Sequence, residues 1–233
     1  MLDFIIEVSV LSGGLVPVLA LVLLISLAVI IERWWYIAKV VKIGDAIEHD
    51  ILLVKYQSVE QLQQVAKHYE GSPQANVVKA AVASRGESAE DMERHIEEAL
   101  LWELPKLDKN LWVLDTGVTL GPLLGLFGTV IGMIQAFGAI GNHGVSNPNA
   151  ITGGIGHALI ATAGGLLIAI FAVGFLNYFN KRIRLTVNQL ELVKTMLINR
   201  LHGGGVDHAV LQGKKAAAQA ASNGKPNVAA QGA

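Results

Sequence analysis

Polar side chains that could contact an ion occur within a 65-residue stretch, 116–180, that contains no Asp, Glu, Lys or Arg. Hydroxyl, amide and imidazole groups at membrane depth usually face a bundle interior or a water-filled cavity. Thr129 and Thr162 are the strongest candidates, because each lies among small residues where a second helix or a pore can approach. The alternative is a threonine that bonds only to its own helix. The full set is Thr116, Thr119, Thr129, Gln135, His157 and Thr162.

Carboxylates are missing from the deep part of every apolar segment. Asp115 lies at the mouth of one segment, and Glu32 closes another beside Arg33. Proton- or sodium-driven proteins normally use an intramembrane acid, so an ion-driven role would require an acid from another chain. His157 has a side chain that can titrate near neutrality. Burial disfavours its charged form, and we therefore expect a neutral, hydrogen-bonded histidine.

Small residues recur every three or four positions in two of the apolar segments, which places each set on one helical face. Small residues at such spacing let the backbone of another helix approach closely. We therefore expect these faces to pack helices together, within one subunit or between subunits. The predicted packing residues are Gly121, Gly125, Gly128, Gly132, Gly154, Ala158 and Gly165.

The composition places the chain among integral membrane proteins. Of its 233 residues, 52% are hydrophobic and only 16% are charged, and the mean hydropathy is +0.46. The formal net charge of -1 gives a nucleic-acid role no electrostatic support. The absence of cysteine excludes disulfides, thiolate metal sites and cysteine nucleophiles. We expect no cofactor and no metal.

Three apolar segments are long enough to cross a bilayer as helices, since about 20 residues span its core. Basic residues follow the first and third segments and precede the second, and the positive-inside rule then puts the N-terminus outside and the C-terminus in the cytoplasm. The predicted fold is an all-α integral membrane protein with three transmembrane helices and long helical cytoplasmic extensions. The predicted segments are an outer N-terminus 1–14, transmembrane helices 15–36, 111–140 and 151–180, a cytoplasmic helical domain 37–110, an outer loop 141–150, a cytoplasmic helix 181–202 and a disordered tail 203–233.

Two membrane blocks carry a family resemblance. LDTGVTLGPLLGLFGTVIGMIQAF, residues 114–137, and GIGHALIATAGGLLIAIFAVGFLNYF, residues 154–179, resemble the MotA/TolQ/ExbB proton channel family. The span count is similar to its three-span ExbB/TolQ branch and disfavours the four-span MotA proteins. The blocks are highly specific to the family, whereas the cytoplasmic domain matches only in outline.

The resemblance implies a homopentamer in the bacterial inner membrane, with the second and third spans lining a pore. That pore would hold a dimer of an ExbD- or TolR-like single-span protein that supplies the missing aspartate. Proton flow would then energise a TonB- or TolA-like protein. Carried over by position, Thr129 and Thr162 become pore-lining contacts for the ion, and we add Thr119 and His157 as ion-path candidates. His157 stands where family members often have glutamate.

Three alternatives remain beside a motor subunit of a TonB system. The chain could serve a TolQ-like envelope-maintenance motor, or it could be a non-conducting membrane scaffold, which would also explain the missing acid. An enzyme or stand-alone transporter is disfavoured, because the sequence has no nucleotide loop, metal cluster or nucleophile–base pair. Threonine hydroxyls can contact either a proton carrier or Na⁺, so the sequence does not distinguish a proton-driven from a sodium-driven protein.

Overall fold

The computed structural model describes residues 14–55, 58–143 and 148–202, and this part of the chain consists of helices without strands. The predicted tail 203–233 and most of the predicted outer N-terminus lie outside the described residues, as do residues 144–147 of the predicted loop. The helices are α2 (Leu15–Leu53), α3 (Val59–His68), α4 (Pro73–Ala83), α5 (Ala89–Leu107), α6 (Leu111–His143) and α7 (Pro148–Leu201).

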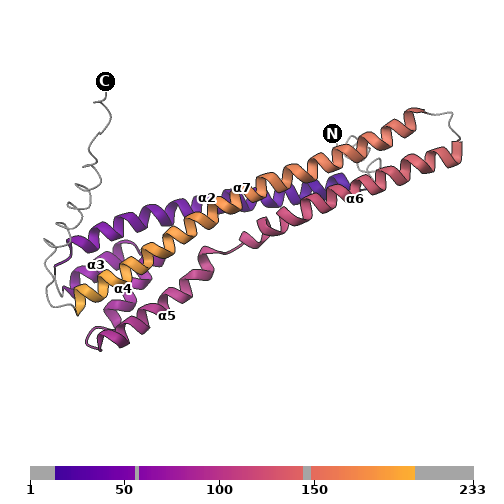
Figure 1. Ribbon diagram of the computed structural model, residues 1–233. Helices are drawn as coiled ribbons and strands as arrows, with labels where there is room; N and C mark the ends of the chain where they lie inside the picture. Colours follow the sequence, from indigo (N-terminus) through magenta and orange to yellow (C-terminus); the bar gives the residue numbers. More distant parts are fainter. Residues whose placement is uncertain (1–13, 56–57, 144–147, 203–233) are drawn as a thin grey trace, which may run out of the picture.

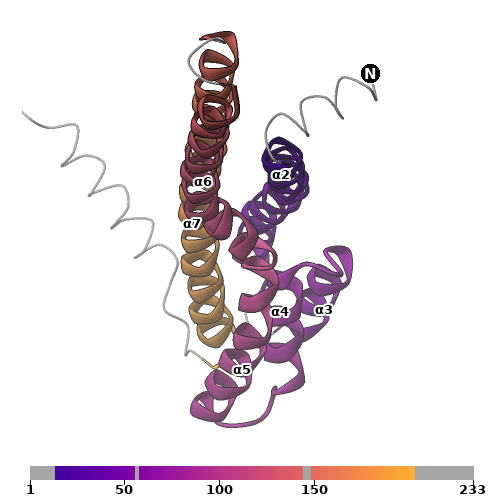
Figure 2. The same cartoon turned by 90° about the vertical axis from the view of Figure 1, so that its right-hand side faces the viewer.

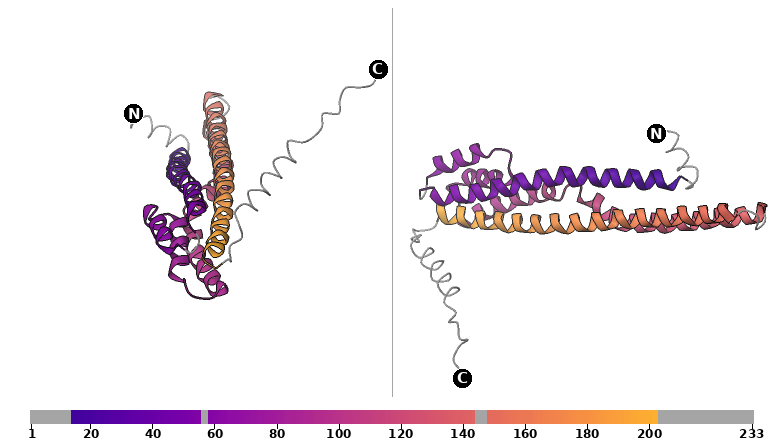
Figure 3. Two further views of the ribbon diagram at one scale, coloured as in Figure 1. Left: turned by 90° about the vertical axis from the view of Figure 1, so that its left-hand side faces the viewer. Right: turned by 90° about the horizontal axis from the view of Figure 1, so that it is seen from above.

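Three of these helices are long and apolar enough to cross a membrane. They are α2, α6 and α7, and they lie lengthwise beside one another, while α3, α4 and α5 gather at one end (Figure 1). We call this end, together with the adjoining parts of α2 and α7, the helical bundle. The α6–α7 hairpin extends past the first residues of α2 at the other end (Figure 3). The all-α fold with three potential membrane helices is therefore confirmed.

Two of the long helices greatly exceed the thickness of a bilayer. Helix α7 has 54 residues, which corresponds to about 80 Å at 1.5 Å per residue, against a hydrocarbon core of about 30 Å. The third predicted span and the predicted helix 181–202 are therefore one continuous helix. Helix α2, with 39 residues, likewise continues from its apolar half into the bundle. The bundle is built directly onto the membrane helices.

The bundle has its own hydrophobic core, to which α2, α3, α4, α5 and α7 all contribute. Ile47 and Ile51 of α2, Met92 and Ile96 of α5, and Leu190 of α7 are fully buried in it. Their spacing of three to four residues puts each set on one helical face. Burying a side chain of this size contributes about 1.5–3 kcal/mol. We call the apolar parts of α2, α6 and α7 outside the bundle the membrane part. It contains few buried large hydrophobic side chains and packs instead through small residues.

Charged groups add specific links between helices of the bundle. Lys194 of α7 donates to Glu97 of α5 at 2.6 Å, and its Nζ lies 3.0 Å from Glu191 and 3.7 Å from Glu93. The hydrogen bond to Glu97 is the main cause of a raised pKa for Lys194, which therefore keeps its charge. Arg200 is buried and donates to the carbonyl of Leu52, at the last turn of α2, at 2.8 Å.

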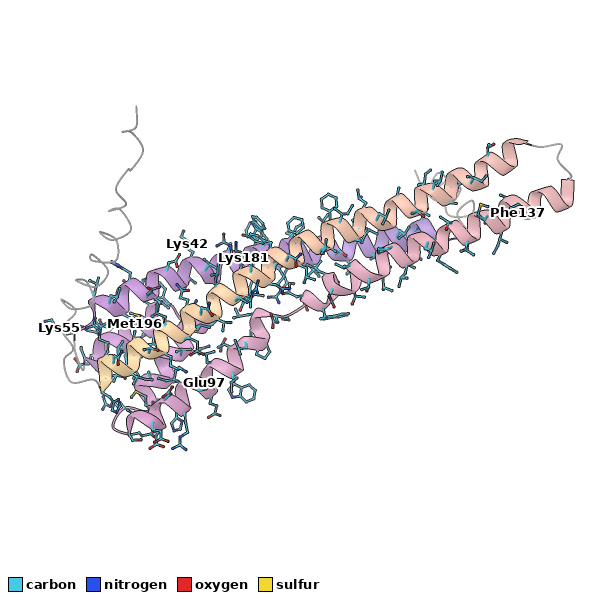
Figure 4. All side chains as sticks on the ribbon, viewed as in Figure 1. Lys42, Lys55, Glu97, Phe137, Lys181 and Met196 are labelled. Carbon is cyan, nitrogen blue, oxygen red and sulfur yellow. The ribbon has the colours of Figure 1, made fainter. Side chains whose placement is uncertain are left out.

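Basic residues from different helices lie toward the bundle end of the molecule. Figure 4 places Lys42 of α2 and Lys181 of α7 on the bundle side and Phe137 of α6 near the opposite end. Trp34 stacks on Tyr178 at 5.2 Å between ring centres, and the Arg182 guanidinium lies over the Tyr178 ring. Such aromatic and basic residues are typical of a membrane–water interface. The orientation in the membrane stays a prediction.

Helix caps in the bundle provide a first test of the structure. The Ser72 hydroxyl accepts a hydrogen bond from the Ala75 amide at 3.1 Å, whereas Ser58, at the start of α3, makes no such bond. Loss of a capping hydroxyl costs about 1 kcal/mol. We expect Ser72→Ala to lower the free energy of unfolding by about 1 kcal/mol and the matched Ser58→Ala to leave it nearly unchanged. Thermal or denaturant unfolding of the purified protein measures both, and equal effects would contradict the cap assignment.

Candidate functional site

The first element of the site is the contact between α6 and α7, which is built from the predicted small residues. A Cβ atom added at Gly121 would lie 2.6 Å from the Gly165 carbonyl oxygen, and one at Gly132 would lie 2.7 Å from the Ala158 Cβ. These distances leave no room for a side chain, so the two backbones touch. We call this contact the glycine seam. Its members are Gly121, Gly125, Gly128 and Gly132 on α6, and Gly154, Ala158, Ala161 and Gly165 on α7.

Thr162 lies directly at the glycine seam. Its hydroxyl donates to the carbonyl oxygen of Gly125 on the other helix at 3.0 Å. The bond forms because Gly125 has no side chain and its Cα lies close to the Thr162 backbone; a Cβ at Gly125 would lie 3.0 Å from the Thr162 Cα. The hydroxyl therefore joins α6 to α7, and its oxygen lone pairs remain available as acceptors.

The other threonines use their own helices as acceptors. Thr129 donates to the Leu126 carbonyl at 2.7 Å, and Thr119 donates to the Thr116 carbonyl at 3.0 Å. Thr116 donates to the Trp112 carbonyl at 2.8 Å. This is the local bonding that threonine often adopts in membrane helices. Because the hydroxyl hydrogen is already donated to a carbonyl, each hydroxyl oxygen is free to accept a hydrogen bond or to coordinate a cation.

Helix α2 packs on only one side of the α6–α7 pair. Leu15 and Leu19 of α2 form a buried cluster with Ile168 of α7, against which Leu124 and Ile131 of α6 also pack. Figure 2 shows α2 and the bundle on this side of the pair. In Figure 2 no other helix of the described part lies on the opposite side of the pair. We call that side the free edge of the pair.

Thr129 and Thr162 both lie toward the free edge. At about 100° per residue, Thr129 is about 160° round α6 from Ile131, and Thr162 is about 120° round α7 from Ile168. Thr129 also follows Gly125, the partner of Thr162, by one helical turn. The structure therefore brings these two hydroxyls to the same edge, about one helical turn (about 6 Å) apart in depth. Thr119 is about 15 Å closer to the bundle and about 80° further round α6 from Thr129.

His157 is not grouped with these threonines. It lies about 140° round α7 from Thr162 and within about 20° of Ile168, on the side that faces α2. Leu15 packs one turn closer to the bundle, where it meets Gly128 opposite Ala161. The histidine therefore lies on α7 beyond the first described residues of α2. Its predicted place in the ion path stays a prediction, but it would belong to a different face from Thr129 and Thr162.

Ser26 is a buried polar residue of the membrane part that was not predicted from the sequence. Ser26 of α2 is only 4% exposed, and its hydroxyl has no hydrogen-bond partner among the described residues. It faces Gly117 of α6, where an added Cβ would lie 3.3 Å from the Ser26 oxygen. A single serine in a leucine-rich segment carries no periodic signal. Only the packing of α2 against α6 shows that it is buried.

These features define a multi-pass helical membrane protein whose spans pack through glycines and carry hydroxyl groups along one open edge. The model of the MotA/TolQ/ExbB proton channel family matches residues 69–192, more than half of the chain and all of α6. The chain belongs to this family, in its ExbB branch. The family comprises channel and transport-motor subunits rather than enzymes.

Individual relatives agree with this assignment. The protein named ExbB-like 3 of Synechocystis sp. is 29% identical over 78% of this chain and 87% of its own length. The protein named ExbB-like 1 of the same organism is 32% identical over 70% of this chain and 66% of its own length. Biopolymer transport protein ExbB of Xanthomonas campestris pv. campestris is 37% identical over 44% of this chain and 42% of its own length. These relatives are named as proteins of biopolymer transport, and the chain is similar to them over the spans given.

Proposed function

We propose that the chain forms the channel of an ion-driven motor in the bacterial inner membrane. Five copies would surround a dimer of an ExbD-like single-span partner and energise a TonB-like protein. The observation that carries this proposal is the free edge of the α6–α7 pair, where Thr129 and Thr162 present oxygen atoms in a stretch without carboxylates. An edge of this kind suits a partner helix that brings its own acid.

The chemistry of the proposed site is the relay of an ion between hydroxyl oxygens and a partner carboxylate. Intramembrane carboxylates are costly and are retained where ions or protons pass. The hydroxyls cost little to bury, because their hydrogens already bond to carbonyls of Leu126 and Gly125. They can therefore stabilise a passing proton carrier or cation without adding a fixed charge to the wall of the channel.

Reconstitution tests this function. The complex of this chain with its single-span partner, in proteoliposomes under a potassium–valinomycin potential, should pass protons, measured with an internal pH dye. The flux should fall to background when the partner's intramembrane Asp is replaced by Asn. A parallel assay with a Na⁺ gradient and an internal Na⁺-sensitive dye identifies the ion. A complex that assembles but conducts neither ion, or a partner without an intramembrane acid, would instead support a non-conducting scaffold.

A further inference from the structure

The middle of α2, where its apolar half ends, contacts the turn that links the bundle to α6. Arg33 of α2 is only 1% exposed, and its Nη1 donates to the carbonyl oxygen of Lys106 at 3.2 Å. Lys106 lies in the last turn of α5, where helix carbonyls lack a partner within their own helix. The guanidinium carbon also lies 5.1 Å from the centre of the Tyr36 ring. Arg33 therefore caps α5 from a different helix.

The neighbouring Glu32 holds the other side of the same turn. Its Oε2 accepts a hydrogen bond from Asn110 Nδ2 at 2.9 Å. Asn110 has a φ of 63° and so adopts the left-handed conformation that directs the chain from α5 into α6. That conformation costs roughly 1–2 kcal/mol for most residues and is tolerated by asparagine. Glu32 and Arg33 thus contact the turn on both sides.

The burial of Arg33 is expensive, which argues that it has a specific role. Its Nε has no hydrogen-bond partner among the described residues. The buried carboxylate of Glu103 is bonded instead by Asn76 at 2.8 Å and Lys106 at 2.6 Å. Removing a charge from water costs several kcal/mol, and a hydrophobic residue of similar size is often as stable or more stable at such a position. Packing alone does not require an arginine here.

We propose that Glu32 and Arg33 are positioning residues that fix the direction in which α6 leaves the bundle. Helix α6 carries Thr129 and one side of the glycine seam, so this turn sets the free edge relative to the bundle. The effect on ion flow rests on the proposed function, whereas the effect on helix direction does not. Figure 1 shows the turn between α5 and α6.

The test uses the full chain, whose lack of cysteine makes labelling clean. Spin labels at Glu98→Cys on α5 and Leu123→Cys on α6, diluted among unlabelled copies, report the α5–α6 distance distribution in nanodiscs. We expect Arg33→Met to broaden this distribution and to lower ion flux of the reconstituted complex about tenfold, while thermal stability is kept because a buried charge is removed. Glu32→Ala should act in the same direction more weakly, because Glu32 is exposed.

Two controls separate positioning from a general loss of structure. Glu32→Gln keeps an oxygen that can accept from Asn110, so it should restore the narrow distribution and the flux. Glu60→Ala, an exposed glutamate on α3, should change neither. A narrow distribution in both Arg33→Met and Glu32→Ala overturns the proposal, and so does a broadened distribution with full flux. If the complex with the unmodified chain passes no ions, the proposed function fails, and the distance distributions alone decide the positioning role.

Discussion

Replacement of Thr162 by valine should lower ion flux through the reconstituted complex about a hundredfold, the order of the rate loss in enzymes that lose one hydrogen bond to a developing charge. Valine has nearly the shape of threonine but cannot accept or donate a hydrogen bond. The oxygen at the free edge is therefore lost, and with it the hydrogen bond to Gly125. Ion flux in proteoliposomes measures the effect on conduction, and the mass of the purified complex shows whether it still assembles.

The expected effect on assembly is small, which makes the result interpretable. Hydrogen bonds between membrane helices contribute on average about 0.6 kcal/mol, so loss of one bond should not dissolve the α6–α7 pair. Thr162→Ser keeps the hydroxyl and should retain most of the flux. Thr129→Val removes an oxygen whose bond stays within α6, so it should reduce flux with no change in packing. Full flux in Thr162→Val would remove this residue from the ion path.

Replacement of Gly165 by alanine should prevent the close contact of α6 and α7. The added Cβ would press on the Gly121 carbonyl oxygen and would lie 3.0 Å from both the Cα and the backbone nitrogen of Gly125. These are backbone atoms that cannot rotate away. Overpacking of this kind costs about 1–3 kcal/mol or more. We expect a large fall in thermal stability and loss of the assembled complex, measured by fluorescence-detected size-exclusion chromatography on heating.

The same helix offers a matched control for this prediction. Gly174 also lies in α7, but an added Cβ there would meet no atom within 4 Å. Gly174→Ala should therefore keep the complex assembled, and alanine favours a helix by about 1 kcal/mol over glycine. If both variants behave alike, helix propensity rather than close packing at the glycine seam governs stability.

Much of the fold could be predicted from local patterns. Long uncharged segments predict membrane helices because the bilayer excludes unpaired backbone groups, and the structure has three helices of that kind. Serine is favoured immediately before a helix and so signals its start. Ser72 and Ser88 stand directly before α4 and α5, where both serine hydroxyls accept a backbone hydrogen bond. Ser58 has a similar signal without that bond. Helix caps depend on residues that are adjacent in the chain, so they can be recognised in the sequence alone.

The sequence predicts which side chains share a face of one helix, but it does not predict which other helix that face contacts. Three- and four-residue spacing puts Gly121 and Gly125 together on α6, and the structure sets this face against α7. The spacing does not say where α2 packs. That position is decided by contacts of Leu15 and Leu19 with residues far along the chain, and it places His157 toward α2 and the two threonines toward the free edge.

The sequence by itself therefore determined the membrane class, the family resemblance and the candidate hydroxyls, because hydropathy and helical period are properties of short segments. Only the tertiary structure decided that Thr162 bonds across to Gly125 and that Arg33 is buried against α5. A charged residue at the end of an apolar run is normally expected to reach water. Its burial depends on α5 returning to the middle of α2 after 73 residues of chain, and no local pattern contains that information.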